Sequence, residues 1–278
     1  MTDFCYLNGE IVPLAEAKVS VNDIGMLRGF GIYEGLVTHN RKPFMLKDHL
    51  ERFHRSAEMM MLKVPATDAE IEKAINELVS RNVPEGKEAL IRFILTGGPT
   101  AGVIEYDYET PTFYMLATEF VPLEERYLRE GCSIATVDYR RELAEIKSIN
   151  YIKAVLLQKA RKELGALEMV YVKDGVVYEG LGSNIFIVKD GTLITPKEGI
   201  VYGITRKAVL DLARQSFPIE ERQVSEAEMY AADEVLITGS FKEVVPVVRI
   251  NDRQIGNGAV GPVSARIVEL FREFTRTY

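Results

Sequence analysis

The chain has 278 residues, with 34 lysines and arginines against 41 aspartates and glutamates, for a formal net charge of −7. An acidic chain without a basic run is a poor match for nucleic acid or an anionic membrane, because nothing offsets phosphate repulsion. Cys5, Cys132 and the three histidines form no metal-ligand pattern, so we expect neither a disulfide framework nor a metal site. Apolar runs are too short to span a bilayer, which favours a cytoplasmic enzyme or binding protein.

Residues 1–118 read as a small α/β domain, and residues 119–126 as a charged connection that contains Pro122. Asn8-Gly9 suits a hairpin turn, and Thr67 with Glu70 forms a capping box that starts a helix. The expected elements of this domain are, in chain order, a hairpin of Phe4–Leu7 and Glu10–Val12, a helix over Leu46–Leu62, a helix after Thr67, and strands at Ala89–Thr96 and Thr112–Thr118.

Residues 127–278 read as a larger domain. Its expected elements are a strand at Ser133–Asp138, a helix over Ser148–Leu164, hairpins of Glu168–Lys173 with Val176–Glu179 and of Asn184–Val188 with Thr192–Thr195, helices at Gly203–Gln215, Ser225–Ala231 and Val263–Phe274, and strands at Glu234–Thr238 and Val244–Val248. Hairpins mixed with helices indicate two α+β or α/β domains rather than one doubly wound parallel sheet.

Common phosphate-binding and hydrolase motifs are not satisfied. The glycines of residues 29–35 have the wrong spacing for a dinucleotide fingerprint, and Val103-Ile104 stand where a P-loop needs Lys and Ser or Thr. The chain also has no Gly-x-Ser-x-Gly nucleophile elbow. These observations make nucleotide-driven and serine-hydrolase chemistry poor candidates.

Four local patterns could carry other chemistry. Lys147 stands just before the expected helix, where the helix dipole disfavours a cation, and a lysine that loses its proton readily can add to a carbonyl. Glu179 ends a strand before a glycine-rich turn that lets backbone approach a ligand. Arg52, beside apolar helix positions, needs an anion, which a carboxylate of the chain could equally supply. A helix start at Gly203–Arg206 and the strand end before Ser240 could form an anion cup, although helix capping explains the first as well.

Together and in this order, the patterns resemble one family. The motifs that carry the resemblance are His49–Ala57 (HLERFHRSA), Ile146–Tyr151 (IKSINY), Glu179–Phe186 (EGLGSNIF), Gly203–Arg206 (GITR) and Glu243–Val247 (EVVPV). The chain is similar to the class IV aminotransferases, which are fold-type IV enzymes dependent on pyridoxal 5′-phosphate. The resemblance implies that fold in two domains, that coenzyme, and a homodimer with shared active sites.

The resemblance also implies roles for single residues. Lys147 would hold the coenzyme covalently and move the proton between the substrate Cα and the coenzyme. Glu179 would face the pyridine nitrogen, where a carboxylate keeps the ring protonated. Tyr151 would donate to the phenolic oxygen, Arg52 would bind the phosphate, and the remaining cofactor-binding residues would be Ile204, Thr205, Ser240 and Phe241.

The substrate class depends on two arginines. The Arg-x-His pair of familiar D-amino-acid transaminases is absent, whereas Arg92 stands in an apolar strand and Arg28 where branched-chain enzymes tend to have an aromatic residue. We expect both arginines to clamp the substrate α-carboxylate, as in less typical D-amino-acid transaminases, and Tyr33 to line the pocket. An ion pair of Arg92 with Glu34, and a subunit contact for Arg28, are the structural alternatives.

The leading interpretation is therefore transfer of an amino group between a D-amino acid, such as D-alanine or D-glutamate, and 2-oxoglutarate or pyruvate. A branched-chain L-amino-acid aminotransferase is the close alternative. An aminodeoxychorismate lyase, an (R)-amine transaminase and a coenzyme-binding protein without catalysis are less favoured. Retention of both Lys147 and Glu179 argues against the last of these.

Overall fold

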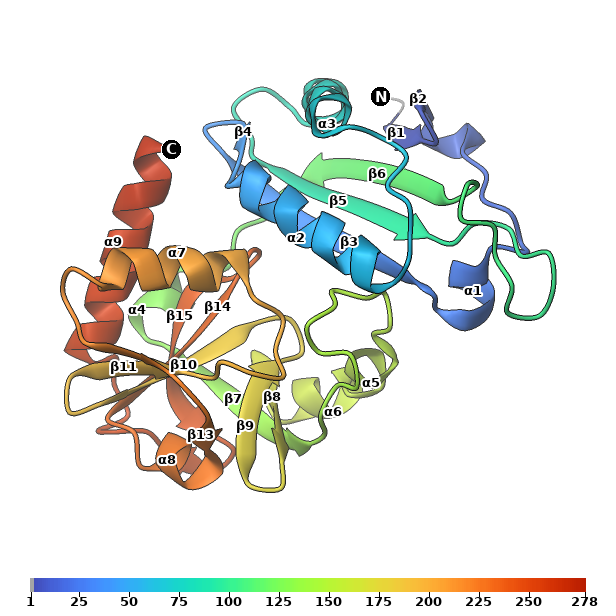
Figure 1. Cartoon of the computed structure of the whole chain (residues 1–278). Helices are drawn as coiled ribbons and strands as arrows, with labels where there is room; N and C mark the ends of the chain where they lie inside the picture. Colours follow the sequence, from blue (N-terminus) through green and yellow to red (C-terminus); the bar gives the residue numbers. More distant parts are fainter. Residues whose placement is uncertain (1–2) are drawn as a thin grey trace. The chain divides into compact units, whose positions relative to one another are not determined.

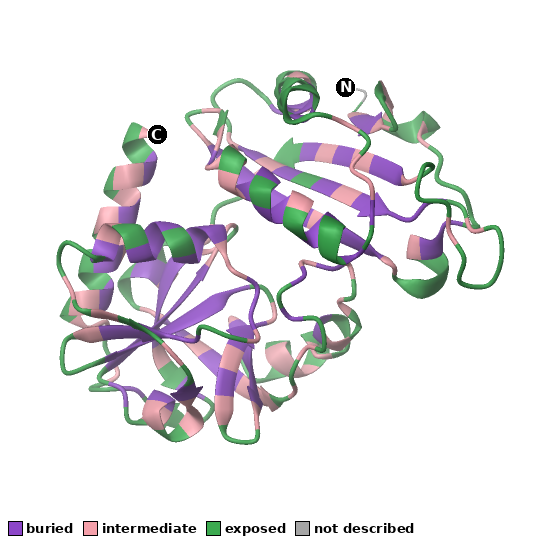
Figure 2. Cartoon of the chain, in the orientation of Figure 1, coloured by how far each residue is buried: buried purple, intermediate pink, exposed green. Residues whose placement is uncertain are grey.

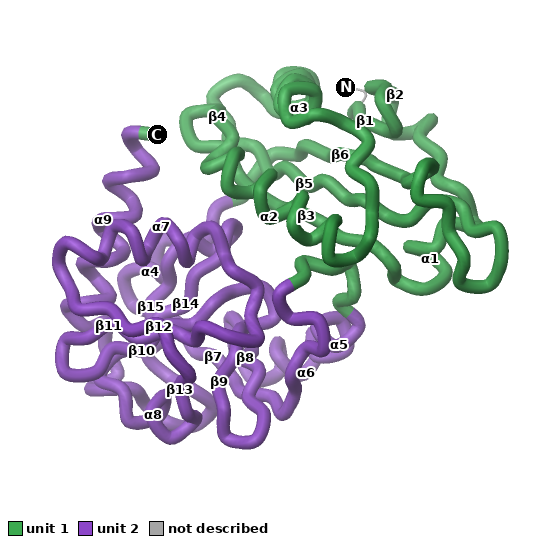
Figure 3. The backbone as a smooth tube through the Cα atoms, in the orientation of Figure 1, with its two compact units in different colours: residues 1–121, 146–151, 278 green, residues 122–145, 152–277 purple. Residues whose placement is uncertain are grey.

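A computed structural model describes residues 3–278; residues 1 and 2, at the start of the expected first domain, lie outside the described part. Its contacts divide the chain into two compact units (Figure 3). Unit 1 contains the chain up to Val121 together with Ile146–Tyr151 and Tyr278, and unit 2 contains Pro122–Glu145 and Ile152–Thr277. The change of unit at residues 121 and 122 falls inside the segment 119–126, and Lys147 belongs to the same unit as the amino-terminal part.

Unit 1 is built on an antiparallel sheet with the strand order β2-β1-β6-β5-β3-β4 in its described residues (Figure 1). Its strands are β1 (Phe4–Leu7), β2 (Glu10–Pro13), β3 (Gly31–His39), β4 (Lys42–Pro43), β5 (Ala89–Thr96) and β6 (Thr112–Glu119). Its helices are the 3-10 turn η1 (Leu14–Glu16), α1 (Ile24–Arg28), α2 (Leu46–Met59) and α3 (Asp68–Asn82).

Helices α2 and α3 supply the core of unit 1. Helix α2 packs on β3 and α3 on β6 and β1, and the residues between helices and sheet are buried (Figure 2). Alternate residues Ile32, Glu34 and Leu36 of β3 are completely buried, which follows from the two-residue period of a strand. The expected capping box is confirmed, because Thr67 accepts from the Glu70 amide and Glu70 accepts from the Thr67 amide. Glu34 is a buried glutamate in this core and therefore requires polar partners.

Unit 2 contains a ten-stranded mixed sheet with the path β12-β11-β10-β14-β15-β7-β8-β9-β13, to which β16 adds beside β15. The strands are β7 (Cys132–Asp138), β8 (Glu168–Lys173), β9 (Val176–Gly180), β10 (Asn184–Lys189), β11 (Thr192–Thr195), β12 (Ile219–Glu221), β13 (Val224–Ser225), β14 (Glu234–Gly239), β15 (Glu243–Ile250) and β16 (Arg253–Gln254). The helices are α4 (Glu125–Arg129), α5 (Ile152–Leu156), α6 (Gln158–Glu163), α7 (Ile204–Ala213), α8 (Glu226–Tyr230) and α9 (Pro262–Thr277). Helices α7 and α9 pack on each other and on β14. In residues 3–278 no helix is both long and apolar enough to cross a membrane.

Most expected elements are confirmed, one differs from the structure, and the strand β3 was not among them. This strand contains the glycines Gly31 and Gly35. Gly31 is required there, because a Cβ would lie 2.7 Å from the carbonyl oxygen of Leu95 on the neighbouring strand. The expected helix over Ser148–Leu164 is wrong at its start: α5 begins at Ile152, and α6 follows it as a separate helix.

Candidate active site

The backbone around Lys147 is extended and pairs with β3. The carbonyl of Lys147 accepts from the Tyr33 amide at 2.9 Å, and the Ile149 amide donates to the Gly31 carbonyl at 3.0 Å. Ser148 and Ile32 form the bridge between these bonds. This pairing explains why the segment cannot be helical, so the expectation that a helix dipole acts on Lys147 is wrong. The position of the lysine is set by a sheet edge instead.

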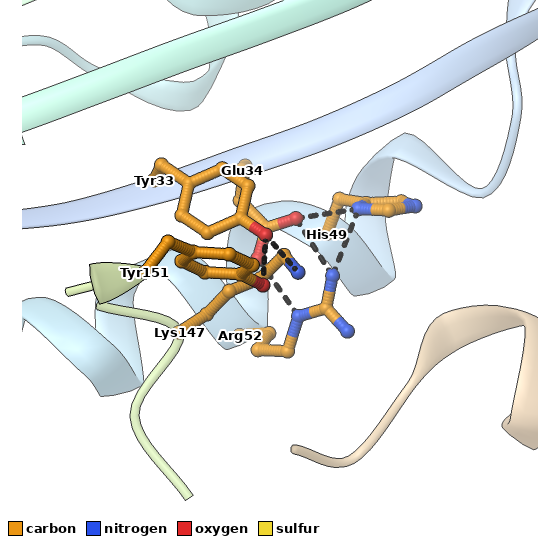
Figure 4. A network of polar contacts seen from close by, with 6 residues as sticks. All are labelled: Tyr33, Glu34, His49, Arg52, Lys147 and Tyr151. Carbon is orange, nitrogen blue, oxygen red and sulfur yellow. Dashed lines mark hydrogen bonds and ion pairs between the residues drawn. The ribbon is translucent and has the colours of Figure 1, made fainter. Parts of the chain in front are cut away.

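Two tyrosines surround the Lys147 amine (Figure 4). Lys147 Nζ donates to the Tyr33 hydroxyl at 3.1 Å and lies 4.4 Å from the centre of the Tyr33 ring. The Tyr33 hydroxyl is in turn 2.5 Å from the Tyr151 hydroxyl, with the two rings edge to face. The amine is therefore held beside two phenols, which can pass protons and orient a bound carbonyl compound.

Arg52 is buried and its anion is Glu34. Arg52 Nε donates to Glu34 Oε1 at 2.7 Å and Nη2 donates to Oε2 at 2.7 Å, in a bidentate pair. His49 Nδ1 lies 2.7 Å from the same Oε2. Glu34 comes from β3, and His49 and Arg52 come from the buried face of α2 (Figure 4). This network orients the guanidinium within the core of unit 1.

Burial and pairing act in opposite directions on these groups. Burial would raise the pKa of Glu34, but the charge of Arg52 and the hydrogen bonds from His49 and Arg52 hold it well below its ordinary value. Burial lowers the pKa of His49, and Glu34 counteracts this only in part. Glu34 and Arg52 are therefore charged and His49 is neutral around pH 7.

The second group of polar residues, in unit 2, centres on Glu179 at the end of β9. Its side chain is buried, with Arg141 Nη1 3.0 Å from Oε1 and the Val201 amide 2.8 Å from Oε2. Each carboxylate oxygen thus accepts from a different segment, which fixes the plane of the group. Asn184 Nδ2 donates to the carbonyl of the same Val201 at 2.8 Å, so β10 also anchors this loop.

The start of α7 and the turn after β14 have the features of an anion site. Gly203 caps α7 without a side-chain hydrogen bond, and the first-turn residues Ile204 and Thr205 are buried. The Thr238 hydroxyl, at the end of β14, is buried and finds no hydrogen-bond partner among the described residues. Ser240 is partly exposed in the turn that follows, and Phe241 beside it is exposed. Helix amides with nearby hydroxyls favour a bound anion.

The two arginines of the expected clamp are exposed. Arg28 ends α1 and donates to the Leu27 carbonyl at 2.8 Å, and within residues 3–278 neither Arg28 nor Arg92 forms an ion pair. The alternative pairing of Arg92 with Glu34 is wrong, because Glu34 is bound by α2. In the register Glu34 opposes Phe93 whereas Gly35 opposes Arg92, so Glu34 and Arg92 point to opposite faces of the sheet. By the same register Arg92 shares its face with Tyr33.

The sequence did not predict the roles of three residues in these groups. Glu34 would have required a polar partner if its segment had been recognised as a buried strand. His49 stands three residues before Arg52, the spacing that brings two side chains to one helix face. Arg141 had no such signal: its pairing with Glu179 joins positions 38 residues apart.

Comparison with known proteins identifies the family. The family model Amino-transferase class IV matches residues 31–250. A putative branched-chain-amino-acid aminotransferase of Methanocaldococcus jannaschii is 35% identical, with 96% of this chain and 95% of the relative covered. A D-alanine aminotransferase of Staphylococcus haemolyticus is 32% identical, with 97% and 96% covered. The solved branched-chain amino acid aminotransferase of Thermobaculum terrenum in its PLP-form superposes with a TM-score of 0.87 at 26% identity, over 99% of this chain and 94% of that one.

Proposed function

Because the chain belongs to the class IV aminotransferases, fold-type IV enzymes, we propose that it transfers an amino group between a D-amino acid and a 2-oxo acid. Its coenzyme is pyridoxal 5′-phosphate, as in the family. The observation that supports an amino acid and a 2-oxo acid over an uncharged amine as substrates is the pair Arg28 and Arg92, exposed cations without an ion-pair partner in residues 3–278. Such arginines are suited to the α-carboxylate that amino acids and 2-oxo acids share.

The residues present fit the coenzyme. An aldehyde requires an amine, which Lys147 offers beside Tyr33. A pyridine nitrogen requires a carboxylate, which Glu179 offers in a fixed plane. A phosphate requires cations and N–H or O–H donors, and the uncapped start of α7 together with the unpartnered Thr238 hydroxyl supports such a site.

In this proposal the chain orients the reactants and moves one proton. When bound, the coenzyme supplies a carbonyl that takes up the amino group and a ring that withdraws electrons from the substrate Cα. Lys147 would hold the coenzyme through Nζ and, when Nζ is free of it, would remove and return the proton at the substrate Cα. The Tyr33 hydroxyl, 3.1 Å from Nζ, keeps the amine oriented between these events. Tyr151 would donate to the phenolic oxygen of the coenzyme.

The remaining residues hold the two ends of the coenzyme. Glu179 would accept a hydrogen bond from the protonated ring nitrogen, and Arg141 and the Val201 amide keep its carboxylate in place. Arg52 would contribute a cation to phosphate binding, and Ile204 and Thr205 would contribute groups from the first turn of α7. The bidentate pair with Glu34 orients the Arg52 guanidinium before the anion arrives. Ser240 and Phe241 complete the phosphate-binding turn.

We also propose a homodimer whose subunits share active sites. Helix α5 exposes three large apolar side chains, Ile152 at 69%, Val155 at 63% and Leu156 at 73%. Neighbouring exposed apolar residues on one short helix are typical of a covered surface, and a second copy is the partner that the family resemblance implies. Light scattering of the purified chain would give twice the mass of the monomer, and a monomer at micromolar concentration would contradict this proposal.

A branched-chain L-amino-acid aminotransferase is the second candidate. It is favoured by the relative from M. jannaschii, which is more similar than the D-alanine relative, and by the solved structure with a TM-score of 0.87. The deciding experiment offers D- and L-forms of alanine, glutamate and leucine to the holoenzyme and follows the coenzyme spectrum. Conversion to the amine form by the D-enantiomers supports the proposal, and conversion by L-leucine alone would replace it with the branched-chain function.

A further inference from the structure

Glu168, at the start of β8, has a buried carboxylate that binds two loops. Its Oε2 accepts from the Ser183 hydroxyl at 2.9 Å and from the Gly182 amide at 3.3 Å, and Oε1 accepts from the Met169 amide at 3.0 Å. Lys242 Nζ lies 3.1 Å from the same Oε2. The side chain of Glu168 is 3% exposed and that of Lys242 is 24% exposed. The Glu168 carboxylate therefore contacts both the turn after β9 and the turn after β14.

These two turns are in direct contact. A Cβ on Gly239 would lie 2.9 Å from the Gly182 carbonyl oxygen, so the backbones approach as closely as glycine allows. A Cβ on Gly180 would collide with Ser183 Oγ and lie 2.9 Å from Glu168 Cγ. The glycines of the motif after Glu179 thus leave room for the Glu168 side chain. Lys242 contacts the Glu168 carboxylate from the turn after β14. In this turn the Lys242 amide donates to the Gly239 carbonyl at 3.0 Å.

The surroundings make the ion pair necessary. Burial, with a smaller contribution from the Glu168 charge, raises the pKa of the Cys132 thiol to about 12, so this neighbour stays neutral and adds no second negative charge beside Glu168. Lys242 is the cation that lies against the Glu168 carboxylate. Removing the cation is strongly destabilising, because it leaves a buried carboxylate without its compensating charge.

We propose that Glu168 and Lys242 are positioning residues for the coenzyme phosphate. Their ion pair fixes the turn of Ser240, so that its hydroxyl and amide are oriented before the phosphate binds, and ties that turn to the loop that follows Glu179. This inference rests on the proposed role of Ser240 in phosphate binding. It assigns a function to two residues that touch neither the reacting atoms nor the ring, and it predicts an effect on phosphate-bearing ligands specifically.

The test compares the affinity of the apoenzyme for pyridoxal 5′-phosphate and for pyridoxal, which lacks the phosphate, by equilibrium dialysis. Lys242→Met is expected to weaken binding of the phosphorylated form by about tenfold or more, the effect of losing one charged hydrogen bond. Binding of pyridoxal should change by less than about twofold, because its contacts do not involve the turn. Lys242→Arg keeps the charge and should bind like the native chain.

The matched control is Lys189→Met. Lys189 ends β10 of the same sheet, and its Nζ lies 2.8 Å from Asp233. This variant should leave both affinities unchanged. Adding Glu168→Gln to Lys242→Met should lower the affinity for pyridoxal 5′-phosphate little further, because both changes break the same ion pair. Lys242 lies on a partly exposed turn, so its variants test the pair even if Glu168→Gln alone does not fold.

Unchanged binding of pyridoxal 5′-phosphate by Lys242→Met overturns the inference, as does an equal loss for pyridoxal. Either result would leave the proposed function intact, since the native chain would still bind its coenzyme. If the native chain shows no preference for the phosphorylated form over pyridoxal, the proposed phosphate-binding roles fail, and this inference fails with them.

Discussion

Arg141 Nη1 lies 3.0 Å from Glu179 Oε1, and the side chains of these residues are 14% and 6% exposed. Arg141 belongs to the loop after β7, and Glu179 to the end of β9. The pair is buried enough for its charges to interact strongly, and its geometry keeps the carboxylate in one orientation. If Glu179 serves the ring nitrogen as proposed, Arg141 is the residue that prepares it for this role.

Replacing Arg141 should therefore impair the chemical step. Arg141→Met is expected to lower kcat by about tenfold or more and to shift the coenzyme absorbance, because Glu179 loses its fixed partner. The neighbouring Arg140→Met is the control, since Arg140 is exposed and stacks on Tyr178 at 5.0 Å from the ring centre. Stopped-flow absorbance of the holoenzymes checks both variants. Equal rates for native and Arg141→Met would show that the pair has only a structural role.

If Arg92 binds the substrate α-carboxylate, replacing it should affect only substrates that have a carboxylate. Arg92→Ala should raise KM for amino acids and 2-oxo acids by about tenfold or more, because a carboxylate loses a bidentate partner. An amine substrate without a carboxylate should show little change with the same variant, which makes the substrate its own control. Steady-state kinetics with both classes decides this, and an unchanged KM for amino acids would exclude Arg92 from carboxylate binding.

The buried pair of Glu34 and Arg52 predicts a large effect on stability. Glu34→Gln leaves the guanidinium of Arg52 buried without its anion, which costs about 3–5 kcal/mol of the free energy of unfolding. Glu51→Gln is the control, because Glu51 is exposed on the other side of α2 and lies 4.0 Å from Lys47. Its effect should remain below about 1 kcal/mol. Urea unfolding of the apoenzymes measures both values, and a small loss for Glu34→Gln would contradict the assigned network.

The same network predicts loss of stability in acid. The pKa of His49 is lowered from 6.5 by burial, so the unfolded chain takes up this proton first and stability falls as the pH drops below about 6.5. The pKa of Glu34 is lowered from 4.5, so its contribution is complete above that pH and is lost as the pH falls further. His49→Gln should flatten the dependence between pH 7.5 and 5.5 in urea unfolding. An unchanged slope would mean that His49 does not titrate on unfolding.

Local patterns predicted much of the fold because many elements carry their own signals. The strand Ala89–Thr96 and the helix after the Thr67 capping box lie where they were expected. The strand β3 was missed because its glycines lower strand propensity, and they are tolerated only through pairing with β5, which lies some 60 residues away in the sequence. The extended segment around Lys147 has the same explanation: its partner is β3, more than 100 residues earlier.

The candidate site was predictable to the extent that its residues lie in motifs. Lys147, Glu179 and Arg52 were singled out from short stretches, and the structure gives each a defined hydrogen-bond geometry. Their partners Glu34, Arg141 and Tyr33 come from distant segments. Long-range contacts of this kind follow from the topology and not from spacing along the chain, so the roles of the partners needed the structure.

The covalent role of Lys147 is the central claim, and reduction with borohydride tests it most directly. The holoenzyme is treated with borohydride, digested and analysed by mass spectrometry, with Lys147→Ala and the nearby Lys153→Ala treated in parallel. We expect a pyridoxyl group on Lys147 in the native chain and in Lys153→Ala, and none in Lys147→Ala. A reduced holoenzyme with Lys147 unmodified, or with the label on another lysine, would contradict the account.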